Sequence, residues 1–219
     1  MKLNNQISIV IGTKDTFMNF IINAFKAEES RDRILGVLLT ELSKISNYKK
    51  YNNDVIEGII LNKKIKSLAI EHPRMHTSMN RLRMKNKKNN FAIIEVFFDH
   101  FLAKNWESFS NEPYDIFAAK IHNALIKNLT SLPNSTIAKF PEILSKSWLD
   151  NYKTIEGVHT IIRKLTHTSR VGVNSEESIF DLMENYSSFQ NDFMFFMKDM
   201  EKETPINFEI TELQHKIYA

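Results

Sequence analysis

Apolar residues recur at intervals of three and four along most of the 219-residue chain, the spacing of one face of an α-helix. With only 5 Gly and 5 Pro, the chain has little room for a long linker or for turn-rich β-structure. We therefore predict an all-α fold, a single-domain helical bundle. The predicted helices cover residues 17–25, 31–42, 54–72, 91–106, 114–129, 155–165 and 175–202, with a basic helix that begins at 73 and a short one around 148–152.

Local signals place several helix ends. Ser30 and Asn174 are predicted N-caps, and Glu177 three residues after Asn174 resembles a capping box. Pro73 ends one helix and suits the first position of the next. The segment 91–106 is apolar nearly all round, as expected of a central core helix. An aromatic and methionine face on 175–202 favours core packing over a ligand groove: Phe180, Met183, Phe189, Phe193, Phe196 and Met197.

Composition narrows the class of protein. A 42% hydrophobic chain of this length can bury one core, and the net charge of +3 permits an acidic partner without demanding nucleic acid. Cys does not occur, which excludes disulfides and thiolate metal sites. No apolar stretch reaches the roughly 18 residues of a membrane span, and no signal-peptide pattern opens the chain. The expectation is a cytoplasmic protein with neither a nucleic acid nor a membrane as partner.

Candidate chemistry lies in the helix predicted over 91–106, where Asp99 and His100 interrupt an aromatic run and Glu95 precedes them by one turn. A buried polar group that lacks a partner costs on the order of 2–7 kcal/mol and a buried charge costs more, so Asp99 must bind a partner, a metal or a ligand. These three residues are the predicted remnants of a catalytic site.

The run over 95–110 and the segment 148–157 resemble the acyl carrier protein phosphodiesterase family. The resemblance spans about residues 18–196 and implies an all-helical scaffold related to HD-domain hydrolases. It also implies removal of the 4′-phosphopantetheine arm from holo acyl carrier protein, a reaction of lipid metabolism that uses a divalent metal such as Mn²⁺. The predicted domain is 18–204, between an extension at 1–17 and a tail at 205–219, with Met18 as a possible alternative start.

Four family patterns supply the metal site, and this chain departs from each. In Met-Asn-Phe-Leu-Ala-His, Asn23 replaces the histidine. In Gly-Asn-x-x-x-Asp, Val37 replaces the asparagine and Glu41 the aspartate. In Leu-His-Arg-x-Ile-Asp-x-x-Thr-Asp-x-His-Pro, His72 and Pro73 are kept while the polar positions become Asn62, Lys63, Lys66, Ala69 and Ile70. The fourth, Asp-x-x-x-Asp-His, is best kept as Glu95, Asp99 and His100.

These replacements predict that the family's metal is not held, so no cofactor is expected. Amide oxygens are weak ligands for a transition metal, which weakens the sites at Asn23 and Asn62. Lys66 adds a positive charge, and two like charges ~4 Å apart repel by about 4 kcal/mol at an effective dielectric constant of 20. Lys66 could instead pair with Asp99 in place of the metal. Alternatively, Lys63 and Lys66 could hold a phosphate, or Lys63, Lys64 and Lys66 could form a solvated face.

The remaining histidines leave a further alternative open. His72 and His76 are spaced i, i+4 and could form a relocated metal site with Glu95, Asp99 or His100, although a histidine near a helix start more often caps it locally. His72 is also a candidate for substrate binding.

The strongest charge feature is a basic run that could dock an acidic acyl carrier protein, or could be solvated surface. It comprises Arg81, Arg83, Lys85, Lys87 and Lys88. We therefore expect a pseudoenzyme or repurposed protein that binds holo acyl carrier protein. The alternatives are an active phosphodiesterase with a rearranged site and a protein-interaction scaffold.

Overall fold

The computed structural model describes residues 20–42, 50–83, 87–132, 134–137, 145, 147–168 and 174–203. Within these ranges all regular structure is helical, which confirms the predicted all-α single-domain bundle. The predicted extension at 1–17, Met18 and the predicted tail at 205–219 lie outside the described residues.

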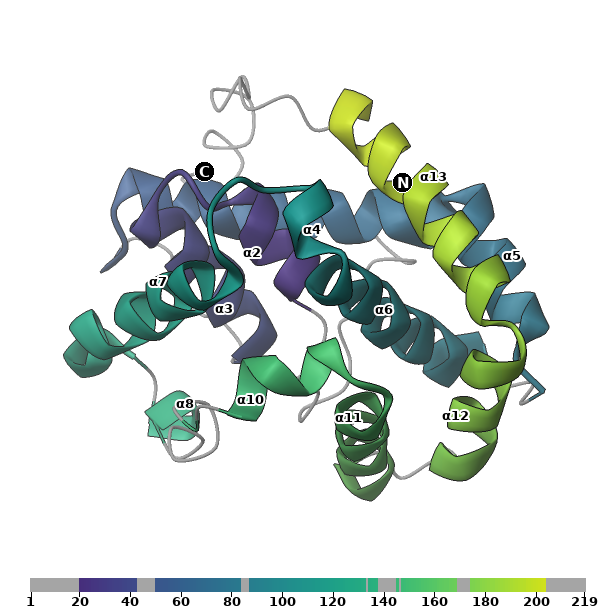
Figure 1. Cartoon of the computed structure of the whole chain (residues 1–219). Helices are drawn as coiled ribbons and strands as arrows, with labels where there is room; N and C mark the ends of the chain where they lie inside the picture. The colour runs from purple at the N-terminus through teal and green to yellow at the C-terminus, as the bar shows by residue number, and fades with distance from the viewer. Residues whose placement is uncertain are drawn as a thin grey trace.

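The elements follow one another as short and long helices (Figure 1). In chain order they are α2 (Ile21–Lys26), α3 (Arg31–Leu42), α4 (Asn53–Glu71), α5 (Pro73–Arg81), α6 (Lys87–Lys104), η2 (Trp106–Ser108), α7 (Tyr114–Lys127), η3 (Leu129–Ser131), α8 (Asn134–Ile137), α10 (Ser147–Asp150), η4 (Asn151–Lys153), α11 (Ile155–Thr168), α12 (Ser175–Glu184) and α13 (Tyr186–Glu203).

The local capping signals agree with the structure. Pro73 is the first residue of α5. Ser30 Oγ accepts a hydrogen bond from Arg33 N at 3.5 Å at the start of α3. Asn174 Oδ1 accepts from Glu177 N at 3.1 Å, which satisfies one of the free N–H groups at the start of α12.

The single long helix predicted over 175–202 is wrong, because the chain breaks at Asn185 into α12 and α13. Asn185 ends α12 by donating from both its backbone N and its side-chain Nδ2 to Asp181 O, at 3.0 and 3.2 Å. The predicted core face divides accordingly. The α13 residues Phe189, Phe193, Phe196 and Met197 are buried, whereas Phe180 and Met183 on α12 are 51% and 64% exposed.

The core is built on α6, as its apolar sequence predicts. In Figure 1 α6 crosses the middle of the molecule, between α2 on one side and α13 on the other. Phe97 and Phe98 are fully buried and meet Phe189 and Phe193 of α13, with ring centroids 5.2 and 5.8 Å apart. Full burial of such a side chain contributes about 1.5–3 kcal/mol.

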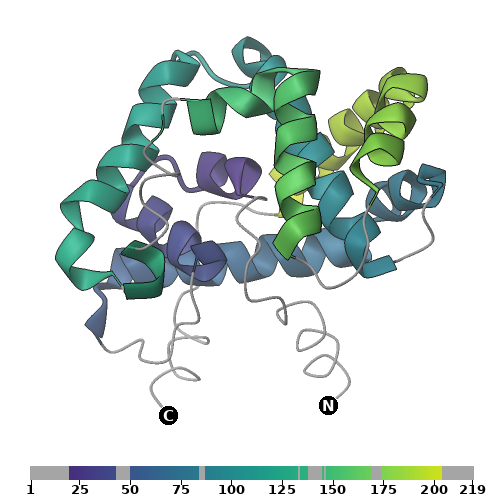
Figure 2. The same ribbon diagram turned by 90° about the horizontal axis from the view of Figure 1, so that it is seen from below.

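Helices α3 and α4 approach each other unusually closely, because each has a glycine at the crossing. A Cβ atom on Gly36 would lie 2.1 Å from Val55 O, and one on Gly58 would lie 2.0 Å from Arg33 O. In Figure 2 α4 extends along one side of the molecule, with α2 and α3 on its inner side. This crossing brings the polar residues of α3 and α4 together in the interior.

Candidate functional site

Side chains from α2, α3 and α4 form a hydrogen-bonded relay. Asn23 Nδ2 donates to Asn62 Oδ1 at 2.5 Å, and Asn62 Nδ2 donates to Glu41 Oε1 at 2.7 Å. Asn23 and Asn62 are buried. Asn23, Asn62 and Glu41, three of the positions at which the sequence departs from the family patterns, are thus neighbours that satisfy one another. Val37 is fully buried in the core and takes no part in the relay.

Lys66 completes this relay. It lies one turn after Asn62 on the same face of α4, and its ammonium donates to Glu41 at 2.8 Å. The Glu41 side chain is only 6% exposed and that of Lys66 is 27% exposed, so the ion pair is largely shielded from water. The predicted pairing of Lys66 with Asp99 is therefore corrected, since Lys66 is hydrogen-bonded to Glu41 on α3.

Asp99 acts as an N-cap for a helix that is distant in sequence. Its Oδ2 accepts hydrogen bonds from Phe20 N and Ile21 N at 3.0 and 3.2 Å, and its Oδ1 accepts from Ile22 N at 2.9 Å. These N–H groups open α2, whose local N-cap residue Phe20 supplies no side-chain acceptor. Burial raises the pKa of Asp99 to about 8, although the three N–H donors act in the opposite direction.

A small cavity lies beside the relay. It has a volume of about 20 Å³, room for about one water molecule, and is lined by Asn23, Lys66, Glu95 and Asp99 with apolar residues of α2, α4, α5, α6 and α13. Burial alone lowers the pKa of an amine, but Glu41 and Glu95 outweigh it, so the pKa of Lys66 lies above its ordinary value. The ammonium is therefore charged at neutral pH.

His100 is adjacent to Asp99 in sequence but binds different groups. Its Nδ1 donates to Tyr152 O at 2.7 Å, and its Nε2 lies 3.0 Å from the hydroxyl of Tyr186, which can donate to it. The side chain is fully buried, and burial lowers its pKa. His100 thus connects α6 to η4 and α13 as a neutral imidazole, on a different side of α6 from Asp99.

His72 has the local role that its position favours. Its Nδ1 accepts from Arg74 N at 3.2 Å as the N-cap of α5, and its ring packs on Phe196. Across the described ranges no three His, Asp or Glu side chains are grouped so that they could hold a metal ion, and the relocated site with His76 is among the arrangements not found there. Lys63 is exposed on α4 and Ile70 half-buried.

The described part of the basic run binds acids of the chain itself. Arg81 forms an ion pair with Asp192, which is 1% exposed and also accepts from Ser78 Oγ at 2.9 Å. Arg83 pairs with Asp181 and Glu184 at 3.1 and 2.8 Å. These contacts tie α5 and its following residues to α12 and α13. Lys85 and the side chains of Lys87 and Lys88 lie outside the described part.

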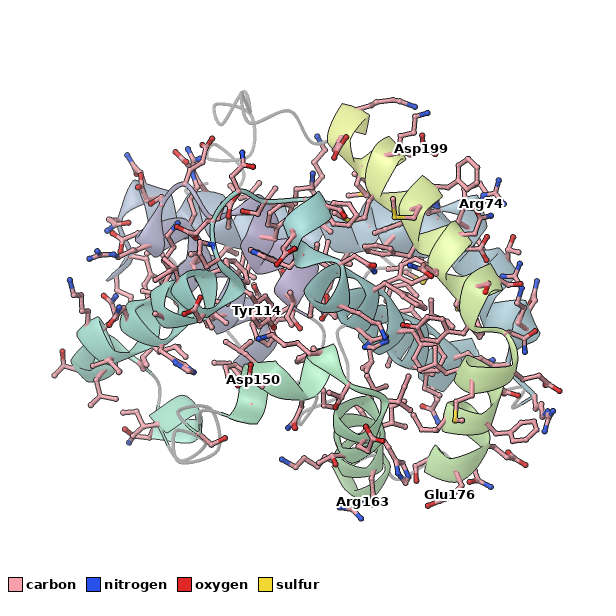
Figure 3. All side chains as sticks on the ribbon, in the orientation of Figure 1. Arg74, Tyr114, Asp150, Arg163, Glu176 and Asp199 are labelled. Atoms are coloured by element: carbon pink, nitrogen blue, oxygen red, sulfur yellow. The ribbon has the colours of Figure 1, made fainter. Side chains whose placement is uncertain are left out.

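Sequence reasoning missed the acids that hold this region. Asp192 lies in an aromatic helix between Phe189 and Phe193, the same signal that singled out Asp99. Arg74, labelled in Figure 3, contacts Asp192 at 3.4 Å from the side of α5 that faces α13. An acid within an apolar helix therefore marked a buried ion pair in this case, a structural role.

A wider groove of about 640 Å³ lies at the end of α6, against η2, α7 and η4. Lys104, Glu107, Asp115 and Lys153 line it, so its charge is mixed. Tyr114, which points toward α10 in Figure 3, forms part of its wall and donates to Leu149 O at 3.0 Å. This groove has the volume of a small-molecule site, unlike the much smaller cavity beside Lys66.

The protein is an all-helical bundle, and α2, α3, α4 and α6 each contribute side chains to its polar cluster. Residues 18–200 match the acyl carrier protein phosphodiesterase family, and the chain belongs to that family. Proteins of that name from Salmonella dublin and Salmonella agona are 22% and 21% identical to it over 184 residues, 84% of this chain and 95% of each relative. No solved structure matches the chain. Among the described helices, none combines the length and apolar character that a membrane crossing requires.

The residues at the family's metal positions do not fit a divalent ion. Asn62 Oδ1 is bound by Asn23, Glu41 is bound by Asn62 and Lys66, and Asp99 is bound by three backbone N–H groups. An ammonium also occupies the cluster, where it would repel a second cation. We derive no chemical step through a metal at this position.

Proposed function

We propose that this protein binds an acyl carrier protein without hydrolysing its phosphopantetheine arm by a metal-dependent route. The relay from Asn23 through Asn62 to Glu41 and Lys66 carries the proposal, because it satisfies at the family's metal positions the groups that would bind the ion. Family membership and the names of the relatives support an acyl carrier protein as partner.

Hydrolysis needs an activated water and a group to take its proton. A divalent ion lowers the pKa of bound water through its open coordination position, which an ammonium does not offer. A general base must be within hydrogen-bond reach of that water. Both nitrogens of His100 are engaged by Tyr152 and Tyr186, and both oxygens of Asp99 by the start of α2. The nitrogens of His100 and the oxygens of Asp99 are thus hydrogen-bonded within the protein.

The small size of the cavity beside Lys66 also limits where the phosphopantetheine arm could bind. The cavity beside Lys66 has room for about one water, so a phosphate held by Lys63 and Lys66 would have to remain at its outer edge. In the proposal, an acidic carrier meets the basic residues at 85–88 in the cytoplasm, and its arm lies across the surface.

Intact mass of the carrier tests the catalytic part of the proposal. Purified protein is incubated with holo acyl carrier protein and Mn²⁺, beside the Salmonella dublin relative as positive control. We expect the mass of the holo carrier to stay unchanged with this protein. Loss of the arm would overturn the proposal and favour an active phosphodiesterase with a rearranged site.

Elemental analysis and calorimetry complete the test. Protein purified without chelator is expected to hold no stoichiometric Mn²⁺, Fe²⁺ or Zn²⁺, and to bind holo acyl carrier protein at low salt. A stoichiometric metal removed by Asp99→Ala would contradict the first expectation. Undetectable binding of both apo and holo carrier would leave the scaffold as the surviving alternative.

A further inference from the structure

The polar cluster gathers several acidic side chains, and Lys66 supplies a positive charge beside them. The side chain of Glu41 is almost fully buried on α3, and Glu95 and Asp99 of α6 line the small cavity that Lys66 also lines. We propose that the Lys66 ammonium is a built-in cation that joins the acidic side chains of α3 and α6, so that the bundle carries its own positive charge at the site. This inference uses the same contact between Lys66 and Glu41 as the proposed function, but it concerns the charge of the site and not the binding of a carrier protein.

Geometry favours a fixed position for this ammonium. Lys66 Nζ donates to Glu41 at 2.8 Å, and Glu41 is held from its other side by Asn62 at 2.7 Å. Asn62 and Lys66 are spaced i, i+4, so one face of α4 supplies both donors. Asn23 orients Asn62 in turn. The carboxylate thus has its partners on two sides before any ligand arrives.

Burial distinguishes this contact from an ordinary surface ion pair. Exposed pairs contribute little, because water competes for both charges. Here the Glu41 side chain is 6% exposed, and removal of its partner would leave a charge inside the bundle. Glu95 adds attraction of the same sign, since it raises the pKa of Lys66, and Asp99 does so only where it is ionised, above its own pKa of about 8.

A double-mutant cycle tests the charge relationship. Lys66→Met keeps the apolar stem and removes the charge, and Glu41→Gln keeps the size and removes the negative charge. Each single variant is expected to lower the melting temperature by about 6 °C or more, given ~2–4 °C per kcal/mol for a chain of this size. The double variant is expected to lose less than the sum of the two. Additive losses would overturn the proposal.

Chemical rescue tests the position of the cation. Lys66→Ala opens space where the ammonium lay, and propylammonium chloride is added as a free substitute against NaCl of equal ionic strength. We expect the amine to raise the melting temperature of Lys66→Ala and to leave the wild type and Lys63→Ala unchanged, Lys63 being the exposed control on α4. An equal effect on all three proteins would contradict a specific cation position.

The wild type provides a further outcome. Since the ammonium already supplies the charge, EDTA and Mn²⁺ are expected to leave its melting temperature unchanged. A fall on chelation would overturn the proposal. These measurements contain no carrier protein, so a failure here is distinguishable from a failure of carrier binding.

Discussion

Asp99 shows what a buried acid does in this chain. Its two oxygens bind the first three described backbone N–H groups, those of Phe20, Ile21 and Ile22. The sequence indicated that Asp99 needed a partner, because a carboxyl group in an aromatic run cannot remain unsatisfied. It could not indicate which partner, since 77 to 79 residues separate Asp99 from these donors.

Replacement of Asp99 should therefore loosen α2. We expect Asp99→Ala to lower the free energy of unfolding by about 3 kcal/mol, because three buried N–H groups lose their acceptor, and Asp99→Asn to cost less because one oxygen remains. Urea unfolding followed by circular dichroism measures this. Asp115→Ala, at an exposed first-turn acid of α7, is the control. An Asp99→Ala protein as stable as the control would refute the capping role.

His100 should make the fold sensitive to mild acid. Burial lowers its folded-state pKa, so the unfolded chain takes up a proton near the ordinary value of ~6.5 while the folded chain stays neutral. Stability is then full above about pH 6.5 and falls as the pH drops below it, by at most about 1.4 kcal/mol per pH unit for this one group.

His100→Asn should reduce that acid sensitivity, because Asn retains a donor near the Nδ1 position and does not titrate. Urea midpoints between pH 5 and 8 measure the difference from wild type. His76→Asn, at an exposed histidine of α5, is the control for the loss of an imidazole. Parallel profiles for wild type and His100→Asn would show that the imidazole does not carry the effect.

At the scale of helices, local signals and long-range contacts differ in how far the sequence predicts them. The caps at Ser30 and Asn174 and the start at Pro73 depend on neighbours within three residues, and each was predictable. The break at Asn185 was not, because the apolar face continues through it and only a single Asn marks the end of α12. The Asn23–Asn62 contact depends on how α2 and α4 pack, which periodicity does not specify.

The α3–α4 crossing should tolerate no added side-chain atom. We expect Gly36→Ala to lower the free energy of unfolding by about 3 kcal/mol, because its Cβ would meet Val55 O at 2.1 Å and force the helices apart. Separation would also weaken the contact between Glu41 on α3 and Lys66 on α4. Urea unfolding measures the loss, with Glu71→Ala at an exposed position of α4 as control. An unchanged midpoint for Gly36→Ala would contradict this close packing.

At the scale of the whole molecule, the basic run serves two purposes in the proposal. Arg81 and Arg83 bind Asp192, Asp181 and Glu184, so their charges hold α5 and its following residues to α12 and α13. Breaking a buried pair such as Arg81–Asp192 costs about 3–5 kcal/mol. We therefore expect charge reversal across the whole run to destabilise the fold, which would hide any effect on docking. The test uses Lys85, Lys87 and Lys88 instead.

The last prediction concerns docking of the carrier protein. We expect the triple variant Lys85→Glu, Lys87→Glu and Lys88→Glu to weaken binding of apo and holo acyl carrier protein alike, because it reverses the charge that attracts an acidic partner. Calorimetry at low and physiological salt measures both carriers, and added salt should weaken wild-type binding since charges are screened within ~8 Å.

The matched control reverses three exposed lysines elsewhere, Lys104, Lys127 and Lys198, with the same change in net charge. If both triple variants lose affinity to the same extent, the attraction comes from overall charge alone, which contradicts docking at 85–88. If only the 85–88 variant loses affinity and its melting temperature is unchanged, the carrier docks at residues 85–88, which follow the Arg81 that pairs with Asp192 of α13.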